Sequence, residues 1–388
     1  MTAHAQGHPT THEHAPVEQL KSLTNDGYGR ARLWLGITGV GTLVVTATAG
    51  LTALQLNPGL GSLAPDIVLL ACFLGCYVLI QLPFDVLGGY AVPRHFGRPH
   101  PPLRTFIRGW ARGVAVHAVL LMTAALGLML ATRLMGITGA LLWALFLSVG
   151  LLRFRWLYAG WLASLRTTDR DTTTRWAKAA DHGFTGGLDG ILGLSVNTVP
   201  ELWRSYLPEE QLRLVRLRRA EAKASGLFFR GRLIAILFTL TGVLAASLVV
   251  GSESMMTAAG VIEFSLLFTL WSFLGLLILP SVSRAAGDAL DRRLTASHDD
   301  TTPALTEALN NLNQLQDAET QRSGLVETVF HPIRSPSRRQ TNSSPPRFAG
   351  WDAARTTVYL SAAGISLLGR AVHCNVGRPS LWAYLPSE

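Results

Sequence analysis

Apolar runs alternate with arginine-rich polar blocks along the chain. Six of the runs are long enough to form membrane-spanning helices, which take roughly 20 residues each. They fall near 33–56, 67–84, 113–132, 134–152, 233–252 and 264–283, and only Arg133 separates the third from the fourth. A shorter run at 359–369 is too brief to cross and predicts an interfacial or packed helix. The pattern therefore predicts an all-α polytopic membrane protein with about six transmembrane helices.

Two polar blocks, 166–232 and 284–350, predict small cytoplasmic segments of mixed α/β structure. In the first block, 167–175 reads as a loop and 183–199 as β-prone. The helix expected at 209–226 is opened by Pro208 and stopped by Gly226. The second block predicts helices near 284–295 and 303–318 and a linker at 340–347. An apolar stripe marks the helix near 303–318: Leu305, Leu309, Leu312 and Leu315.

The pattern divides the chain into six parts. They are a disordered histidine-rich tail (1–32), four transmembrane helices with a basic cytoplasmic loop (33–165), a cytoplasmic segment (166–232), a transmembrane helix pair (233–283), cytoplasmic helices with a linker (284–350), and a C-terminal interfacial segment (351–388). The tail could capture a metal ion loosely, but its low complexity predicts no defined site. Its four spaced histidines are His4, His8, His12 and His14.

Composition agrees with a membrane protein, since 48% of residues are hydrophobic and only 15% are charged. The net charge of +9 could suggest nucleic acid, but its placement follows the positive-inside rule. Arginines concentrate before the first run, between the second and third, after the fourth and after the sixth. We therefore expect a multi-pass protein of a bacterial inner membrane, with both termini cytoplasmic, membrane lipids as partners and no nucleic acid.

Among the predicted spans, His117 is the only ionisable residue well inside one. A transporter hypothesis would begin there, because ionisable residues within membrane helices often mark ion or substrate paths. The spans supply no paired acidic residues for a proton-coupled transporter, and a neutral histidine packed between helices is the simpler interpretation.

Four motifs stand in register along residues 67–340. They are LPFDVLGGYAVPRHFGR at 82–98, LPEEQLRLVRLRRAEAKASG at 207–226, SRAAGDALD at 283–291 and VFHPIRSPSRR at 329–339, with two apolar runs between the second and third. In this order the chain resembles the membrane-embedded zinc metallopeptidases of the CAAX prenyl protease and HtpX-like type. The resemblance implies metallopeptidase-like cytoplasmic segments between the transmembrane helices.

In that family an HExxH helix supplies two zinc-binding histidines and a general base, and a distant glutamate completes the site. The resemblance places the first histidine on Arg218, the general base on Arg219, the second histidine on Ala222 and the distant glutamate on Gly287. Of the distal motifs, these residues match: Ser283, Arg284, Asp291, His331 and Pro332. No HExxH occurs in the sequence, and arginine stays protonated near neutral pH, so it serves as neither ligand nor base.

The resemblance therefore implies a pseudoenzyme without metal or cofactor, which binds a peptide, lipid or membrane-protein partner. One alternative is an active metallopeptidase with unorthodox ligands, drawn from His182, His331 and Glu221. A basic helix face could bind an anion, or could simply be solvated at the membrane surface. It comprises Arg213, Arg216, Arg219 and Lys223.

Overall fold

A computed structural model gives the structure of the protein for residues 26–53, 63–191, 195–297, 301–316, 323–335, 348–363 and 365–386. The predicted linker at 340–347 and all four histidines of the tail lie outside these described residues. The first helix begins at Asp26, before the predicted start of the first span.

Most of the described chain is helical, and five helices are long and apolar enough to cross a membrane. They are α2 (Asp26–Ala53), α3 (Leu63–Val86), α5 (Leu103–Arg153), α9 (Leu227–Val250) and α10 (Ala258–Ser297). Many large apolar side chains on them are exposed, as on Val45, Leu79, Phe146 and Leu248. The predicted helical membrane architecture is confirmed at this level, with five such helices instead of six.

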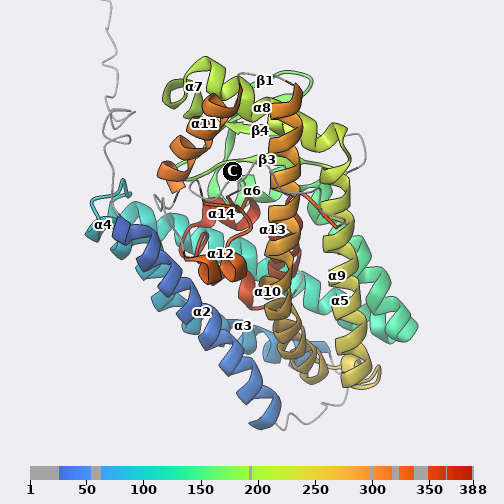
Figure 1. Cartoon of the computed structure of the whole chain (residues 1–388). Helices are drawn as coiled ribbons and strands as arrows, with labels where there is room; N and C mark the ends of the chain where they lie inside the picture. Colours follow the sequence, from blue (N-terminus) through green and yellow to red (C-terminus); the bar gives the residue numbers. More distant parts are fainter. Residues whose placement is uncertain are drawn as a thin grey trace, which may run out of the picture.

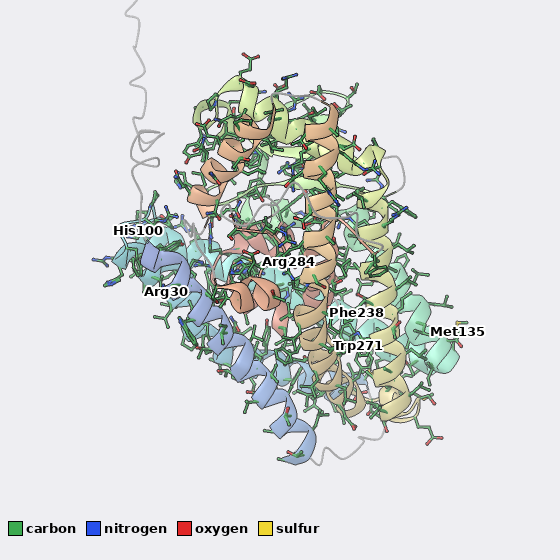
Figure 2. The ribbon with its side chains drawn as sticks, in the orientation of Figure 1. Arg30, His100, Met135, Phe238, Trp271 and Arg284 are labelled. Atoms are coloured by element: carbon green, nitrogen blue, oxygen red, sulfur yellow. The ribbon has the colours of Figure 1, made fainter. Side chains whose placement is uncertain are left out.

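The count differs because the third and fourth predicted spans belong to the single element α5. Gly136 interrupts its helical geometry with a φ of 59° and a ψ of −145°. Beyond this kink the chain folds back, since the Trp143 Nε1 donates to the Ala124 carbonyl at 3.0 Å. In a straight helix those residues would lie about 28 Å apart. Element α5 is therefore a hairpin of two arms, with Met135 at its outer tip (Figure 2).

At one end of the molecule a four-stranded sheet packs with helices α7 (Trp203–Tyr206), α8 (Glu209–Ala224) and α11 (Thr301–Gln316) (Figure 1). We call this the polar end. Its strands are β1 (Arg166–Arg170), β2 (Thr174–Lys178), β3 (Gly187–Asp189) and β4 (Val196–Pro200), in the order β1-β2-β4-β3. Strands β2 and β4 are parallel, and the other two pairs are antiparallel.

The loop expected at 167–175 is wrong, because most of it belongs to the β1–β2 hairpin. Asp171 closes the turn by accepting from the N–H groups of Thr173 and Thr174, at 2.7 and 2.5 Å. Side-chain capping of this kind stabilises a tight turn without glycine. The β-prone assignment of 183–199 is confirmed by β3 and β4.

The helix predicted from Pro208 to Gly226 is confirmed as α8, whose N-cap is Pro208 and which Gly226 follows with a φ of 74°. The leucine stripe of α11 is buried against it. Leu305 and Leu309 pack with Leu214, while Leu312 and Leu315 join a core with Trp176 and Val215. The predicted helix near 284–295 is the continuation of α10, which runs from the apolar helices to the polar end (Figure 1).

The described residues of 351–362 and 365–385 are almost entirely buried. Helix α13 (Ala353–Ala363) packs against α9 and α10, and α14 (Pro379–Ala383) packs against α6 (Arg155–Ala163). The single interfacial or packed helix expected at 359–369 is only partly present: α13 ends at Ala363 and a 3₁₀ turn begins at Leu368, and most described residues of this run are buried. Shorter elements complete the chain: a π turn at Leu87–Ala91, α4 (Val92–His95), 3₁₀ turns at Ser254–Met256 and Leu368–Arg370, and α12 (Gly324–Phe330).

Candidate functional site

Helices α8 and α10 meet where Arg218 faces Gly287. A Cβ atom built on Gly287 would lie 3.3 Å from the Arg218 Nη2, so the guanidinium occupies the space that a larger residue would take. The Arg218 Nε donates to the Asp291 Oδ1 at 2.6 Å, and the arginine side chain is only 4% exposed. Two positions that the sequence motifs single out, far apart along the chain, thus lie side by side.

Ala222, one turn after Arg218, is fully buried in the same contact between helices. It joins an apolar cluster with Ala286 and Leu290 of α10, which flank Gly287, and with Leu188 of β3. A small side chain fits here because α8 and α10 approach closely.

Arg219 points in another direction, toward the sheet. Its Nη1 donates to the Asn197 Oδ1 at 3.0 Å and to the Thr198 carbonyl at 2.9 Å, and its Nη2 donates to the Thr185 carbonyl at 2.7 Å. The guanidinium also lies 5.0 Å from the centre of the Trp203 ring. Arg219 is fully buried and joins α8 to β4 and to the segment before β3.

The other basic residues of α8 do not share one solvent-exposed surface with Arg219. Arg213 and Lys223 are exposed, whereas Arg216 is half-buried and its Nη2 donates to the Thr174 Oγ1 at 3.1 Å. Helical spacing places these side chains on neighbouring positions, but it does not tell which part of the helix the sheet covers.

The matching residues of the distal motifs hold α10, α12 and α13 together. Arg284 donates to three carbonyls at the end of α12: Glu327 at 2.7 Å, Thr328 at 2.9 Å and His331 at 2.5 Å (Figure 2). The Ser283 Oγ accepts from the Ala354 N–H at 3.0 Å. Arginine at a helix C-terminus satisfies carbonyls that have no partner within the helix.

Arg218, Ser283 and Arg284 are among the residues that line a small pocket of about 20 Å³, room for roughly one water molecule. Ion pairs line it: besides Arg218 and Asp291, the Arg334 Nε lies 2.8 Å from the Asp288 Oδ2, and the Arg355 Nη1 lies 2.5 Å from the Asp352 Oδ1. Its remaining lining residues are Ser283, Arg284, Gly287, Pro332, Ile333 and Trp351. Two of the positions matched to the zinc site, Arg218 and Gly287, thus line a very small pocket whose charged side chains are paired with one another.

A larger cavity of about 260 Å³ adjoins this pocket and shares Pro332, Ile333, Arg334 and Arg355 with it. Its walls come mainly from α2, α10 and α13 and from residues 372–374, and they are mostly apolar. The sequence motifs gave no indication of this cavity, because it forms between segments that lie far apart in the chain.

A second polar cluster, which sequence reasoning missed, lies among the long helices. Asp85 of α3 is fully buried and pairs with Arg370; it also accepts from the Trp110 Nε1 at 2.9 Å and from the Gly377 N–H at 3.0 Å. Tyr77 and Gln81 precede Asp85 by two turns and one turn on α3. The four-residue spacing of these polar side chains in an apolar helix was a signal for a buried polar stripe.

His117 is buried next to this cluster. Its Nε2 lies 2.9 Å from the Ala362 carbonyl, and its ring centre lies 5.9 Å from that of Trp382. Of the residues proposed as unorthodox metal ligands, Glu221 pairs with Arg293 at 3.3 Å. The ring of His331 lies edge-on to that of His373, with ring centres 4.8 Å apart. Within the described residues, no group of three His, Cys, Asp or Glu side chains is arranged to hold a metal ion.

In comparisons with known proteins, no family model matches the chain and no curated protein is significantly similar to it.

Proposed function

We propose that this chain is a non-catalytic membrane protein on a scaffold related to the CAAX prenyl protease-type metallopeptidases. The observation that carries the proposal is the contact between Arg218 and Gly287, closed by the ion pair of Arg218 with Asp291. The motifs assign these positions to a zinc histidine and the distal zinc glutamate. Their adjacency supports the proposed register, because two unrelated segments have no reason to meet at these residues.

Elementary chemistry supports a binding role over a hydrolytic one. A guanidinium next to the metal position repels a dication, and it neither coordinates zinc nor accepts a proton from water. Arg219, at the position of the general base, is turned toward the sheet with its donors on Asn197, Thr198 and Thr185. The proposed role is binding of a peptide, a lipid or a membrane-protein partner without cleavage.

The placement of arginine supports a multi-pass orientation in the cell membrane with both termini in the cytoplasm. In this orientation the polar end faces the cytoplasm, and Arg218 lies near the membrane surface. A partner reaching Arg218 would therefore come from the cytoplasmic leaflet or from the cytoplasm.

The direct test measures zinc in the purified protein whose four tail histidines are replaced by alanine. We expect less than about a tenth of an equivalent after dialysis, because a structural or catalytic site would retain zinc. The protein should also show no peptide hydrolysis that a chelator abolishes. Near-stoichiometric zinc, or chelator-sensitive proteolysis, would overturn the proposal and favour the alternative built on His182, His331 and Glu221.

A gain of metal binding tests the register itself. In the double variant Arg218→His with Gly287→Glu, the new imidazole and carboxylate would lie beside Asp291 and provide three ligands for zinc. We expect about one bound zinc per protein in the double variant. Asp291→Asn added to the pair serves as the matched control and should lose most of that zinc. If the double variant binds no more zinc than the native chain, the two positions do not form the former metal site.

The transporter alternative rests on His117 and the polar stripe of α3. It predicts that the native chain supports solute or proton flux in proteoliposomes and that His117→Asn abolishes this flux. The binding proposal predicts no flux for the native chain or for the variant.

A further inference from the structure

The 260 Å³ cavity has an apolar part and a polar part. Apolar walls come from Leu33, Ile37 and Val40 of α2 and from Phe273, Leu276 and Leu277 of α10. These segments belong to helices that are apolar enough to cross a membrane. The apolar part therefore lies at the level where acyl chains of lipids would surround the protein.

Gly41 leaves free space on α2 at the cavity wall, and this space is the inferred opening for an acyl chain. The glycine lines the cavity and is itself exposed, and a Cβ atom built on it would meet no atom within 4 Å. Because this position carries no side chain, a slender apolar group can pass beside α2 at this level.

The polar part is lined by basic side chains, and each of its two arginines also pairs with an aspartate outside the lining. Two arginines and two histidines line the cavity, whereas no Asp or Glu among the described residues does so. Arg334 uses its Nε for Asp288, and within the described part of the chain its two Nη groups make no hydrogen bond. Arg355 is 4% exposed; its Nη1 donates to Asp352, and within the described residues its Nη2 makes no hydrogen bond. Donors of both guanidinium groups are thus left for an anionic ligand.

We propose that this cavity binds a single-chain anionic lipid. Its acyl chain lies between α2 and α10, and its carboxylate or phosphate accepts from Arg334 and Arg355. The inference deepens the proposed function and rests on it, because it names the ligand of a scaffold that binds without catalysis. The cavity is slightly smaller than the roughly 300–1,000 Å³ of common small-molecule sites, which suits one chain better than a two-chain phospholipid.

The experiment titrates the purified full chain, held in neutral detergent, with oleate and counts bound lipid by native mass spectrometry. Oleyl alcohol tests the chain without the charge, and inorganic phosphate tests the charge without the chain. We expect one bound oleate and at least about tenfold weaker binding of either control probe, since a charge-assisted hydrogen bond contributes at least that factor. Equal affinity for oleate and oleyl alcohol would overturn the assignment of Arg334 and Arg355.

Two pairs of variants localise the site. Gly41→Leu fills the opening, and Gly75→Leu is its matched control, because Gly75 is an exposed glycine of α3 that also has free space and does not line the cavity. Arg334→Gln removes a head-group donor, with Arg204→Gln as the control from an exposed ion pair. Gly41→Leu and Arg334→Gln should each weaken oleate binding about tenfold or more, and the controls should bind like the native chain.

Indistinguishable binding by Gly41→Leu and Gly75→Leu would contradict the cavity as the site. Both replace a helical glycine by a better helix former, so lost folding does not explain a difference between them. Failure of the lipid proposal and failure of the proposed function can be told apart. If the protein binds neither oleate nor zinc, only the lipid proposal is wrong. Stoichiometric zinc removes the non-catalytic role, whatever the lipid result.

Discussion

Two buried ion pairs, Arg218 with Asp291 and Asp85 with Arg370, join distant parts of this chain in different surroundings. The first lies where α8 and α10 meet, and Asp291 retains 21% exposure of its side chain. The second lies among the long helices, where both side chains are at most 1% exposed. The first pair marks positions that the sequence motifs identified, whereas the second was found only in the structure.

The difference shows that burial alone does not indicate function. Water near Asp291 can solvate a charge that loses its partner, so the Arg218 pair can be changed to test for a metal site. The Asp85 pair is not accessible to water, and removal of one partner from a fully buried pair leaves an uncompensated charge. We therefore expect the second pair to serve stability and the first to be replaceable.

The largest effect is expected from Asp85→Asn. It leaves the Arg370 guanidinium buried without its counter-charge, which should lower the free energy of unfolding by about 3–5 kcal/mol. The measurement is unfolding of the detergent-purified protein, followed by heat or denaturant.

The double variant Asp85→Asn with Arg370→Gln should recover part of that loss, because no unpaired charge remains. Asp169→Asn, which breaks the exposed pair with Arg204, is the control and should change nothing measurable. If Asp85→Asn and Asp169→Asn are equally stable, the intramembrane pair does not hold the structure together.

A smaller loss is expected from Arg219→Met. The carbonyls of Thr185 and Thr198 would lose the Arg219 donor inside the protein, which should lower the free energy of unfolding by about 1–3 kcal/mol. Arg213→Met, on the exposed side of the same helix, should leave stability unchanged. Were Arg219 instead a solvent-facing anion-binding residue, the two variants would unfold alike and only anion binding would suffer.

The smallest effect concerns pH and the pair of Asp181 with Arg378. Burial would raise the pKa of the Asp181 carboxyl, but the Arg378 guanidinium and the Gly183 N–H outweigh it and hold the pKa below its usual range. A lowered pKa in the folded state stabilises the protein above about pH 4, and this contribution fades as the carboxyl is protonated.

Asp181→Asn should therefore be less stable than the native chain near pH 7 and should approach it as the pH falls from about 5 toward 3. Thermal unfolding midpoints at several pH values would measure this. A difference that stays constant over the range would show that Asp181 does not titrate against folding.

The sequence sufficed for features whose causes are local. Helix α8 follows from Pro208 and Gly226, and the buried side of α11 follows from its leucine spacing. The four-residue recurrence of Tyr77, Gln81 and Asp85 was equally local and was overlooked. The β1–β2 hairpin was missed because Asp171 closes its turn without the glycine or proline that usually mark a turn.

The remaining features depend on contacts between distant segments. The two spans predicted on either side of Arg133 are the two arms of α5, but the position of the fold-back at Gly136 is known only from the structure, where Trp143 contacts Ala124. Likewise, the helical wheel groups Arg219 with Arg213, but only the position of the sheet decides which of them is buried. The cavity beside Gly41 has the same origin, since its walls come from segments separated by most of the chain.

The buried C-terminal segment has a consequence for how the chain is made. Arg32, at the start of the first long helix, donates to the His373 carbonyl across 341 residues, and Arg370 pairs with Asp85 across 285. Both contacts form only after residues 370–373 have been synthesised, so until then Arg32 and Asp85 of the earlier helices lack these partners. Assembly of this part of the fold is therefore completed late. A chain truncated before residue 370 would contain the earlier helices without the contacts of Arg370 and His373.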